Sequence, residues 1–210
     1  MTTYEVAAAT IRQEHHTLEL VIEMLQRLLA DISKQHREPD FALLAAALYY
    51  IDDFPERCHH PKEDEHLFRA VRRRTAAFSP LLDELQAEHV LSARMNGCLQ
   101  RALVHYQGGA PDGLKRFKDA VDRYAGMLRD HMRKEEALLD RVADCLTEED
   151  WREIDAAFDA DDDPLFGTHR REEFRKVYLR IINQLPSKMR LELQRHDRDE
   201  FVPDTGRPPP

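Results

Sequence analysis

FKDAVDRYAGMLRDHMRKEEALLDRV, residues 117–142, shows the helical periodicity that decides the fold. Its apolar residues recur every three or four positions, as they do on the buried face of an amphipathic helix. The positions that continue this face between Leu128 and Leu138 are His131 and Glu135, and both are polar. These two residues are four apart, so their side chains share one face, about 5–6 Å from each other. The pattern therefore predicts a helix that carries a histidine and a glutamate into a protein core. The rest of the apolar face comprises Phe117, Val121, Tyr124 and Val142.

The composition favours an all-α protein. The chain has 210 residues, enough for one well-buried domain with an appendage. Hydrophobic residues make up 42% and charged residues 34%, and only 7 glycines are present, which leaves little turn material for many short strands. We therefore expect an all-α fold.

Breaks in the apolar pattern divide the chain into long helices with short connections. The first break is a polar loop that ends at Pro39, and the last is the glycine- and proline-rich stretch 108–113. Between them, Ser79–Pro80 signals the start of a helix, with Ser79 as the expected N-cap. Asp40 and Thr147 are the expected N-caps of the helices that follow them. We predict helices over residues 4–33, 40–74, 79–106, 114–145, 147–158 and 170–185.

Long amphipathic helices joined by short loops predict an antiparallel up-down-up-down four-helix bundle. We assign residues 1–146 to this bundle and residues 147–202 to a short C-terminal helical extension packed on it. Residues 203–210, with several prolines, have no means of packing and are predicted to be a disordered tail.

The other long helices repeat the inward histidine. His15 occupies the slot between Ile11 and Leu18, whereas its neighbour His16 falls on a charged face and is expected to be solvated. His89 continues the stripe that begins with Leu82 and Leu85 and later carries Ala93.

The second long helix contains the stretch CHHPKEDEHLF, residues 58–68. His59 and Glu63 are four apart, and so are His60 and Asp64. Because Pro55 and Pro61 can kink the helix, the periodicity alone does not decide which pair faces the core.

A single inward histidine is more often a hydrogen-bonded core residue than a metal ligand. Here, however, four helices each supply one, and two of them add a glutamate. Burying two carboxylates costs several kcal/mol each unless they are paired or bind a cation. The combination therefore predicts a metal site. Imidazole and carboxylate ligands suit iron, manganese or zinc, and carboxylates on opposite helices can bridge two ions about 3.5–4 Å apart.

The pattern resembles the hemerythrin-like, or HHE cation-binding, domains over about residues 5–146. The resemblance rests on EHH in the first helix, HHPKEDEHLF in the second, AEH in the third and HMRKEEALL in the fourth. It implies a four-helix bundle that holds two iron ions joined by an oxo or hydroxo bridge, with zinc or manganese as the alternative metals. The spacing within the second motif matches the family at His59 and Glu63. The implied metal ligands are His15, His59, Glu63, His89, His131 and Glu135.

Other residues near this set have weaker assignments. His60, His66 and Tyr124 are candidates for contacts just outside the ligands. For His66 the favoured interpretation is a partly exposed histidine, and Tyr124 fits an ordinary core tyrosine at least as well. Ala93 stands where the oxygen-carrying members have a further histidine, and Glu135 stands one position before their aspartate. These departures imply a more open site and weigh against a reversible oxygen carrier.

The resemblance implies a di-iron protein that binds or reacts with oxygen, nitric oxide or hydrogen peroxide, as a sensor or a detoxification protein. Whether it is an enzyme is left open, since reduction of nitric oxide or peroxide would need an electron donor. The alternatives are iron storage, the repair of iron centres, and a metal-stabilised interaction module. The repair proteins carry a cysteine-bearing domain that is absent here, and the oligomeric state does not follow from the sequence.

Charge, hydropathy and cysteine content exclude several other classes. A net charge of −9 argues against a nucleic-acid binder, and the basic run at residues 72–74 suits the end of a helix. The longest apolar stretch, residues 41–51, is too short to cross a membrane, and no signal peptide is visible. Three widely spaced cysteines do not form a disulfide framework, so a cytoplasmic location is expected.

Overall fold

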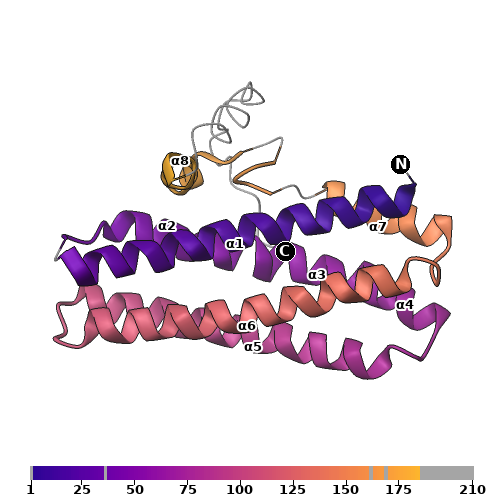
Figure 1. Ribbon diagram of the computed structural model, residues 1–210, viewed down its shortest axis with the longest axis horizontal. Helices are drawn as coiled ribbons and strands as arrows, with labels where there is room; N and C mark the ends of the chain where they lie inside the picture. The colour runs from indigo at the N-terminus through magenta and orange to yellow at the C-terminus, as the bar shows by residue number, and fades with distance from the viewer. Residues whose placement is uncertain (1, 36, 161–162, 168–169, 185–210) are drawn as a thin grey trace.

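The computed structural model is a bundle of helices (Figure 1). The structure describes residues 2–35, 37–160, 163–167 and 170–184, and no β-strand occurs in these ranges. The all-α prediction is therefore confirmed for this part of the chain. Residues 203–210, predicted to be disordered, lie outside the described residues.

The long helices lie side by side along the longest axis of the molecule (Figure 1). The first is α1, Thr3–Gln35, and the later pair is α5, Ser79–Gln107, and α6, Gly113–Val142. Helix α6 packs against both α5 and α1. The turn between α5 and α6 contains Gly109 with φ of +78°, a conformation that favours glycine. Gly113 is also required there, because an added Cβ would lie 2.6 Å from the Cα of Tyr106.

The second long segment is helical throughout but does not keep one helical geometry. It consists of α2, Phe41–Asp53, a π-helical turn at Pro55–His59, α3, His60–Lys62, a second π-helical turn at Glu63–Phe68, and α4, Arg69–Arg74. Asp40 caps its start, accepting a hydrogen bond from the Leu43 amide at 3.0 Å, as predicted. In the first π turn, the amide of His59 donates to the carbonyl of Phe54 at 3.0 Å, five residues back. The sequence predicted only that the prolines could kink this helix.

Residues after α6 form a smaller helical part. Helix α7, Glu148–Ala160, packs along α1, and helix α8, Arg175–Gln184, contacts α1 and α2. Thr147 caps α7 in a reciprocal arrangement with Asp150, as predicted. Helix α8 begins at Arg175 after a single 3-10 turn at Glu172–Phe174, and not near residue 170 as predicted.

Two further predictions, about the start of α5 and the end of α6, are wrong. Helix α5 includes Ser79 as its first residue, and its N-cap is Phe78, so Ser79 is not the cap. Helix α6 ends at Val142, and the chain turns over residues 143–145. Both differences are local, because fraying and turn geometry move helix ends by one to three residues without altering the buried face.

The apolar core is divided into two clusters. One contains Leu18, Phe54 and Leu128, and the other contains Ile11, Leu67 and Leu138. On α1, the second π turn and α6, buried polar residues lie between the two clusters. No helix in the described part of the chain is long and apolar enough to span a membrane.

Candidate metal centre

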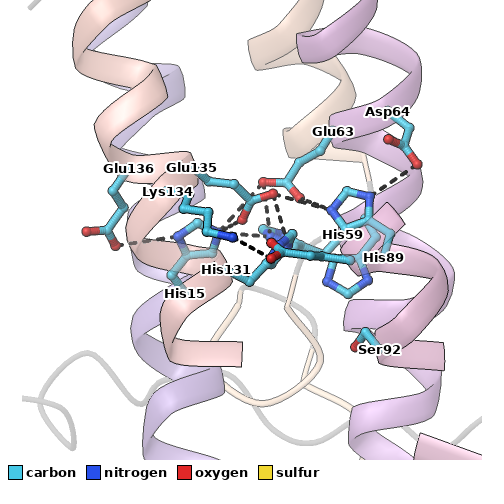
Figure 2. Close-up of polar contacts among 12 residues, drawn as sticks. His15, His59, Glu63, Asp64, His89, Ser92, His131, Lys134, Glu135 and Glu136 are labelled. Atoms are coloured by element: carbon cyan, nitrogen blue, oxygen red, sulfur yellow. Dashed lines mark hydrogen bonds and ion pairs between the residues drawn. The ribbon is translucent and has the colours of Figure 1, made fainter. Parts of the chain in front are cut away.

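The buried polar layer brings together all six residues predicted as metal ligands. They form two groups of potential ligand atoms, and within each group all the atoms lie within 4.8 Å of one another. The first group is His15, His59, Glu63 and Glu135, and the second is Glu63, His89, His131 and Glu135. Figure 2 shows these side chains converging from the neighbouring helices. Glu63 and Glu135 belong to both groups.

Each of the two glutamates turns one oxygen toward each group. Glu63 Oε1 lies 3.4 Å from His59 Nε2, and Glu63 Oε2 lies 3.5 Å from His89 Nε2. Glu135 Oε2 lies 3.4 Å from His15 Nε2, and Glu135 Oε1 lies 3.0 Å from His131 Nε2. Both carboxylates thus lie between two pairs of imidazole nitrogens, the position that bridging carboxylates take in two-metal sites.

Two of the ring nitrogens that face the layer lie as close together as two ligands of one metal ion. His15 Nε2 and His59 Nε2 lie 3.1 Å apart. Two imidazoles can face each other at this distance only if one donates a proton or a cation lies between their lone pairs. Both rings are at most 2% exposed, so bulk water does not separate them.

In all four histidines predicted as ligands, the second ring nitrogen, Nδ1, faces a carboxylate outside the layer. His59 Nδ1 is 2.6 Å from Glu14, and His131 Nδ1 is 3.0 Å from Glu88. His89 Nδ1 lies 3.2 Å from Asp64, and His15 Nδ1 lies 3.5 Å from Glu136 (Figure 2). The contacts of His59 and His131 are hydrogen bonds. Metal-binding histidines commonly donate their second ring nitrogen to a carboxylate, which fixes the tautomer and leaves Nε2 for the metal.

The pKa values show how strongly the layer attracts positive charge. Burial by itself lowers the pKa of a histidine, but the surrounding carboxylates reverse this effect. Opposed by burial, Glu63 and Glu14 still raise the pKa of His59 to about 9, and Asp64, Glu135 and Glu63 raise that of His89 to about 12. The pKa of Glu63 is held well below its usual range despite burial, mainly by His59. Protons on the imidazoles thus supply the charge that a cation would otherwise supply.

Several buried atoms of the layer have no hydrogen-bond partner among the described residues. They include both carboxylate oxygens of Glu63, Oε2 of Glu135 and Nε2 of His131. Buried carboxylate oxygens without donors are costly, by several kcal/mol for an ion. The donor set of imidazoles and carboxylates, without a thiolate, fits iron or manganese. The residues present therefore fit a metal centre.

The residues assigned to the surroundings fall in different places. Tyr124 is buried, and its hydroxyl lies 3.4 Å from Glu56. His60 is also buried, with a ring centroid 4.3 Å from that of His89. His66 is half-buried and lines a surface pocket with Arg69, and Ala93 is exposed. The stripe of α5 continues from His89 through Ser92, three residues on, and not through Ala93.

The sequence analysis did not assign Glu14 or Glu88. Each immediately precedes a histidine of the layer, His15 or His89, yet each contacts a histidine of another helix. The repeated Glu-His dipeptide was the available signal. Its meaning depends on how the helices pack, because neighbouring residues on a helix point about 100° apart.

The model of the Hemerythrin HHE cation binding domain family matches residues 6–143 of the chain. This match spans α1 to α6 and includes every residue of the buried layer. No curated protein and no solved structure is significantly similar to the chain.

Proposed function

Because this chain belongs to the hemerythrin HHE cation-binding domain family, we propose that its buried layer holds two iron ions that bind or react with a small ligand. The ligand class is oxygen, nitric oxide or hydrogen peroxide, and the role is that of a sensor or a detoxification protein. The observation that supports the proposal is the orientation of Glu63 and Glu135. Each of them turns one carboxylate oxygen toward one pair of histidines and the other oxygen toward the other pair.

The proposed ligands are His15 and His59 for one ion, His89 and His131 for the other, and the two glutamates for both. Zinc favours tetrahedral sites, and thiolates where it is structural, and the residues of this layer include no cysteine. Iron accepts more ligands than tetrahedral zinc, so one coordination position can remain exchangeable, as a site that binds a small ligand needs. Such a pair of ions supplies Lewis acidity and redox chemistry at the ligand.

The protein around the ions has three tasks. The negative charges of Glu63 and Glu135 compensate the ions in an apolar interior. The outer carboxylates Glu14 and Glu88 hold the imidazoles in orientation. The two apolar clusters exclude water from both ends of the layer.

Burial limits the size of the ligand. Among the proposed ligand residues the most exposed is His89, at 6%. A large substrate could not reach the ions without moving a helix, whereas a two-atom or three-atom molecule needs only small side-chain motions. This enclosure supports a small ligand over a macromolecular substrate.

We propose an antiparallel up-down-up-down arrangement for the four long segments α1, α2–α4, α5 and α6. The short connections between consecutive segments support it, since they leave no room for a crossover. We likewise propose residues 1–146 as the bundle and residues 147–202 as its extension. The small number of cysteines supports a cytoplasmic location.

The test is the metal content and the ultraviolet–visible spectrum of protein purified without chelator. We expect about two irons per chain, with charge-transfer absorption in the near ultraviolet that changes when azide, nitric oxide or peroxide is added. A folded protein without metal would overturn the proposal. Iron that passes readily to an apo-protein acceptor would instead favour storage or repair. Iron whose spectrum ignores all three ligands would favour a structural role.

A further inference from the structure

A short sequence pattern, His-x-x-Lys-Glu, occurs twice among the residues of the layer, at 59–63 and at 131–135. In each copy the histidine and the glutamate are proposed metal ligands. The lysine, Lys62 or Lys134, stands directly before that glutamate. The proposed function gives neither lysine a role, although the repeat brings one to each half of the layer.

In both copies the lysine and the histidine bind the same outer glutamate. Around His59, the Oε2 atom of Glu14 lies 2.6 Å from Nδ1, and its Oε1 atom accepts a hydrogen bond from Lys62 Nζ at 3.1 Å. In the second copy, Glu88 Oε2 lies 3.0 Å from the histidine Nδ1, and Glu88 Oε1 accepts a hydrogen bond from the lysine. We call these two histidine–glutamate–lysine sets the Glu14 chain and the Glu88 chain.

The two chains differ in their exposure to water. The side chain of Lys62 is 8% exposed, and its Nζ lies 4.6 Å from the ring centroid of Phe158 and 5.6 Å from that of Phe54. Attraction between a cation and an aromatic ring is stronger where water is excluded. In the Glu88 chain the side chain of Lys134 is 31% exposed, and its ammonium also binds the exposed Glu84. The Glu14 chain is therefore enclosed, whereas the Glu88 chain meets the solvent.

Helix α7 causes this difference. Phe158 belongs to α7, which packs along α1, and its ring also lies 5.9 Å from that of His59. The match to the family ends at residue 143, and α7 begins only at Glu148. The enclosure of the Glu14 chain thus comes from a segment outside the part of the chain that shows the family.

The same charge acts more strongly in the enclosed chain. The interaction between two charges varies inversely with the dielectric constant, which is about 80 in water and about 20 as an effective value within a protein. An ammonium shielded from water therefore acts on its partners up to about four times as strongly as one in water, and salt screens it less. Because Lys62 holds one oxygen of Glu14, it also fixes the other oxygen on His59.

We propose that Lys62 is a positioning residue for His59, acting through Glu14, and that α7 gives it this role by burying it. Lys134, which α7 does not cover, has no equal role at His131. This inference rests on the proposed two-ion centre. It makes the two ions unequal, because only the ion at His59 depends on a residue of the C-terminal extension.

The test compares Lys62→Met with the matched control Lys134→Met in the full-length, iron-loaded protein. Methionine keeps an unbranched apolar side chain against Phe158 but removes the charge and the hydrogen-bond donor. We expect Lys62→Met to release iron to a chelator about tenfold faster than wild type, as for the loss of other outer contacts of metal ligands. The control should release iron at close to the wild-type rate, since exposed ion pairs contribute little.

Lys62→Arg separates the charge of Lys62 from its packing. Arginine restores a positive donor to Glu14, so iron release should return toward the wild-type rate. Equal release rates from Lys62→Met and Lys134→Met would overturn the inference. Release from Lys62→Arg as fast as from Lys62→Met would overturn it as well, because the charge would then have no effect.

Proton exchange in the unsubstituted protein covers the case in which Lys62→Met does not fold. In nuclear magnetic resonance spectra of protein with isotope-labelled histidine, the contact with Phe158 identifies His59. Its Nδ1 proton should exchange with water at least about tenfold more slowly than that of His131, because exchange follows the access of water. Equal exchange rates would overturn the inference. This measurement needs no metal, whereas a wild type without iron would overturn the proposed function, so the two failures are distinguishable.

Discussion

At the scale of single residues, Glu63 and Glu135 are the two carboxylates at the centre of the buried layer. Both are fully buried, with exposures of 0%, and both lie among imidazoles. In the metal-free protein the neighbouring histidines must hold protons to compensate them. A metal ion and these protons therefore compete for the same electrostatic field, so metal binding must release protons.

In the proposed two-ion centre, replacing a shared carboxylate should affect both ions together. We expect Glu63→Gln to lose most of its iron, with at least a tenfold increase in the rate of loss to a chelator, because outer contacts alone are worth about 10–100-fold. Glu65→Gln, an exposed neighbour in the same turn, is the control and should behave as wild type. Elemental analysis after dialysis against chelator measures both. Loss of one ion from Glu63→Gln with full retention of the other would contradict a shared carboxylate.

Asp163, which is not one of the proposed metal ligands, predicts a pH dependence of the stability. Burial, assisted by Glu14, raises the pKa of Asp163 to about 7 although Leu165 and Tyr50 donate hydrogen bonds to it. In the unfolded chain its pKa is about 3.9, so the folded state binds more protons between these values. Stability should therefore fall as pH rises from about 4 to 7 and then level off.

Asp163→Asn should remove this pH dependence. We expect the variant to be more stable than wild type by about 1–3 kcal/mol at pH 8, with the difference shrinking toward pH 5. Urea unfolding at several pH values measures it, and the exposed Asp159→Asn is the control. A difference that does not change with pH would show that Asp163 is ionised in the folded protein.

At the scale of elements, the regular helices could be predicted and the irregular one could not. The apolar period of residues 117–142 predicted the buried face of α6, including His131 and Glu135. The same reasoning failed at residues 55–68, because a π turn changes the period and the sequence signals it only through Pro55 and Pro61. This is why the periodicity did not decide between the pairs His59–Glu63 and His60–Asp64. On α5, Ala93 was placed on the buried stripe, which continues three residues after His89, at Ser92.

The junction between α4 and α7 depends on one buried carboxylate. Asp150 is 2% exposed and accepts hydrogen bonds from Arg73 at 2.9 Å, Arg74 at 2.7 Å and the Thr147 amide at 2.9 Å. The basic run that ends α4 was predicted only to suit the helix terminus. The structure shows that it also anchors the start of α7.

Asp150→Ala should therefore loosen the attachment of α7. We expect a loss of about 1–3 kcal/mol in the free energy of unfolding, the range for a lost cap and its charged hydrogen bonds. Glu149→Ala, an exposed neighbour in the same turn, should stay within about 0.5 kcal/mol of wild type. Chemical denaturation compares the two, and equal losses would show that the ion pairs of Asp150 contribute nothing.

At the scale of the whole molecule, the C-terminal helices complete the core on both sides of the polar layer. Phe158 of α7 belongs to the cluster that contains Ile11 and Leu138. Phe174, just before α8, belongs to the cluster that contains Leu18 and Leu128. The sequence predicted that this part packs on the bundle but gave no means of finding which residues it covers, since those contacts join distant segments.

Phe158 and Phe174 have different neighbours, although both are buried. The ring of Phe158 lies 5.9 Å from that of His59, and Lys62 Nζ lies 4.6 Å from its centroid while donating a hydrogen bond to Glu14 at 3.1 Å. Phe174 instead packs on Tyr50, with ring centroids 5.6 Å apart. Helix α7 therefore covers the outer contacts of one proposed ligand, and the segment before α8 does not.

This contrast separates stability from metal retention. Phe158→Ala and Phe174→Ala each remove a buried ring, so each should cost about 3–5 kcal/mol of stability. Only Phe158→Ala should also admit water to the Glu14–His59 pair, and we expect it to release iron to a chelator at least several times faster than Phe174→Ala. Stopped-flow release at a temperature where both variants are fully folded makes the comparison. Equal release rates would mean that α7 stabilises the bundle without protecting its metal centre.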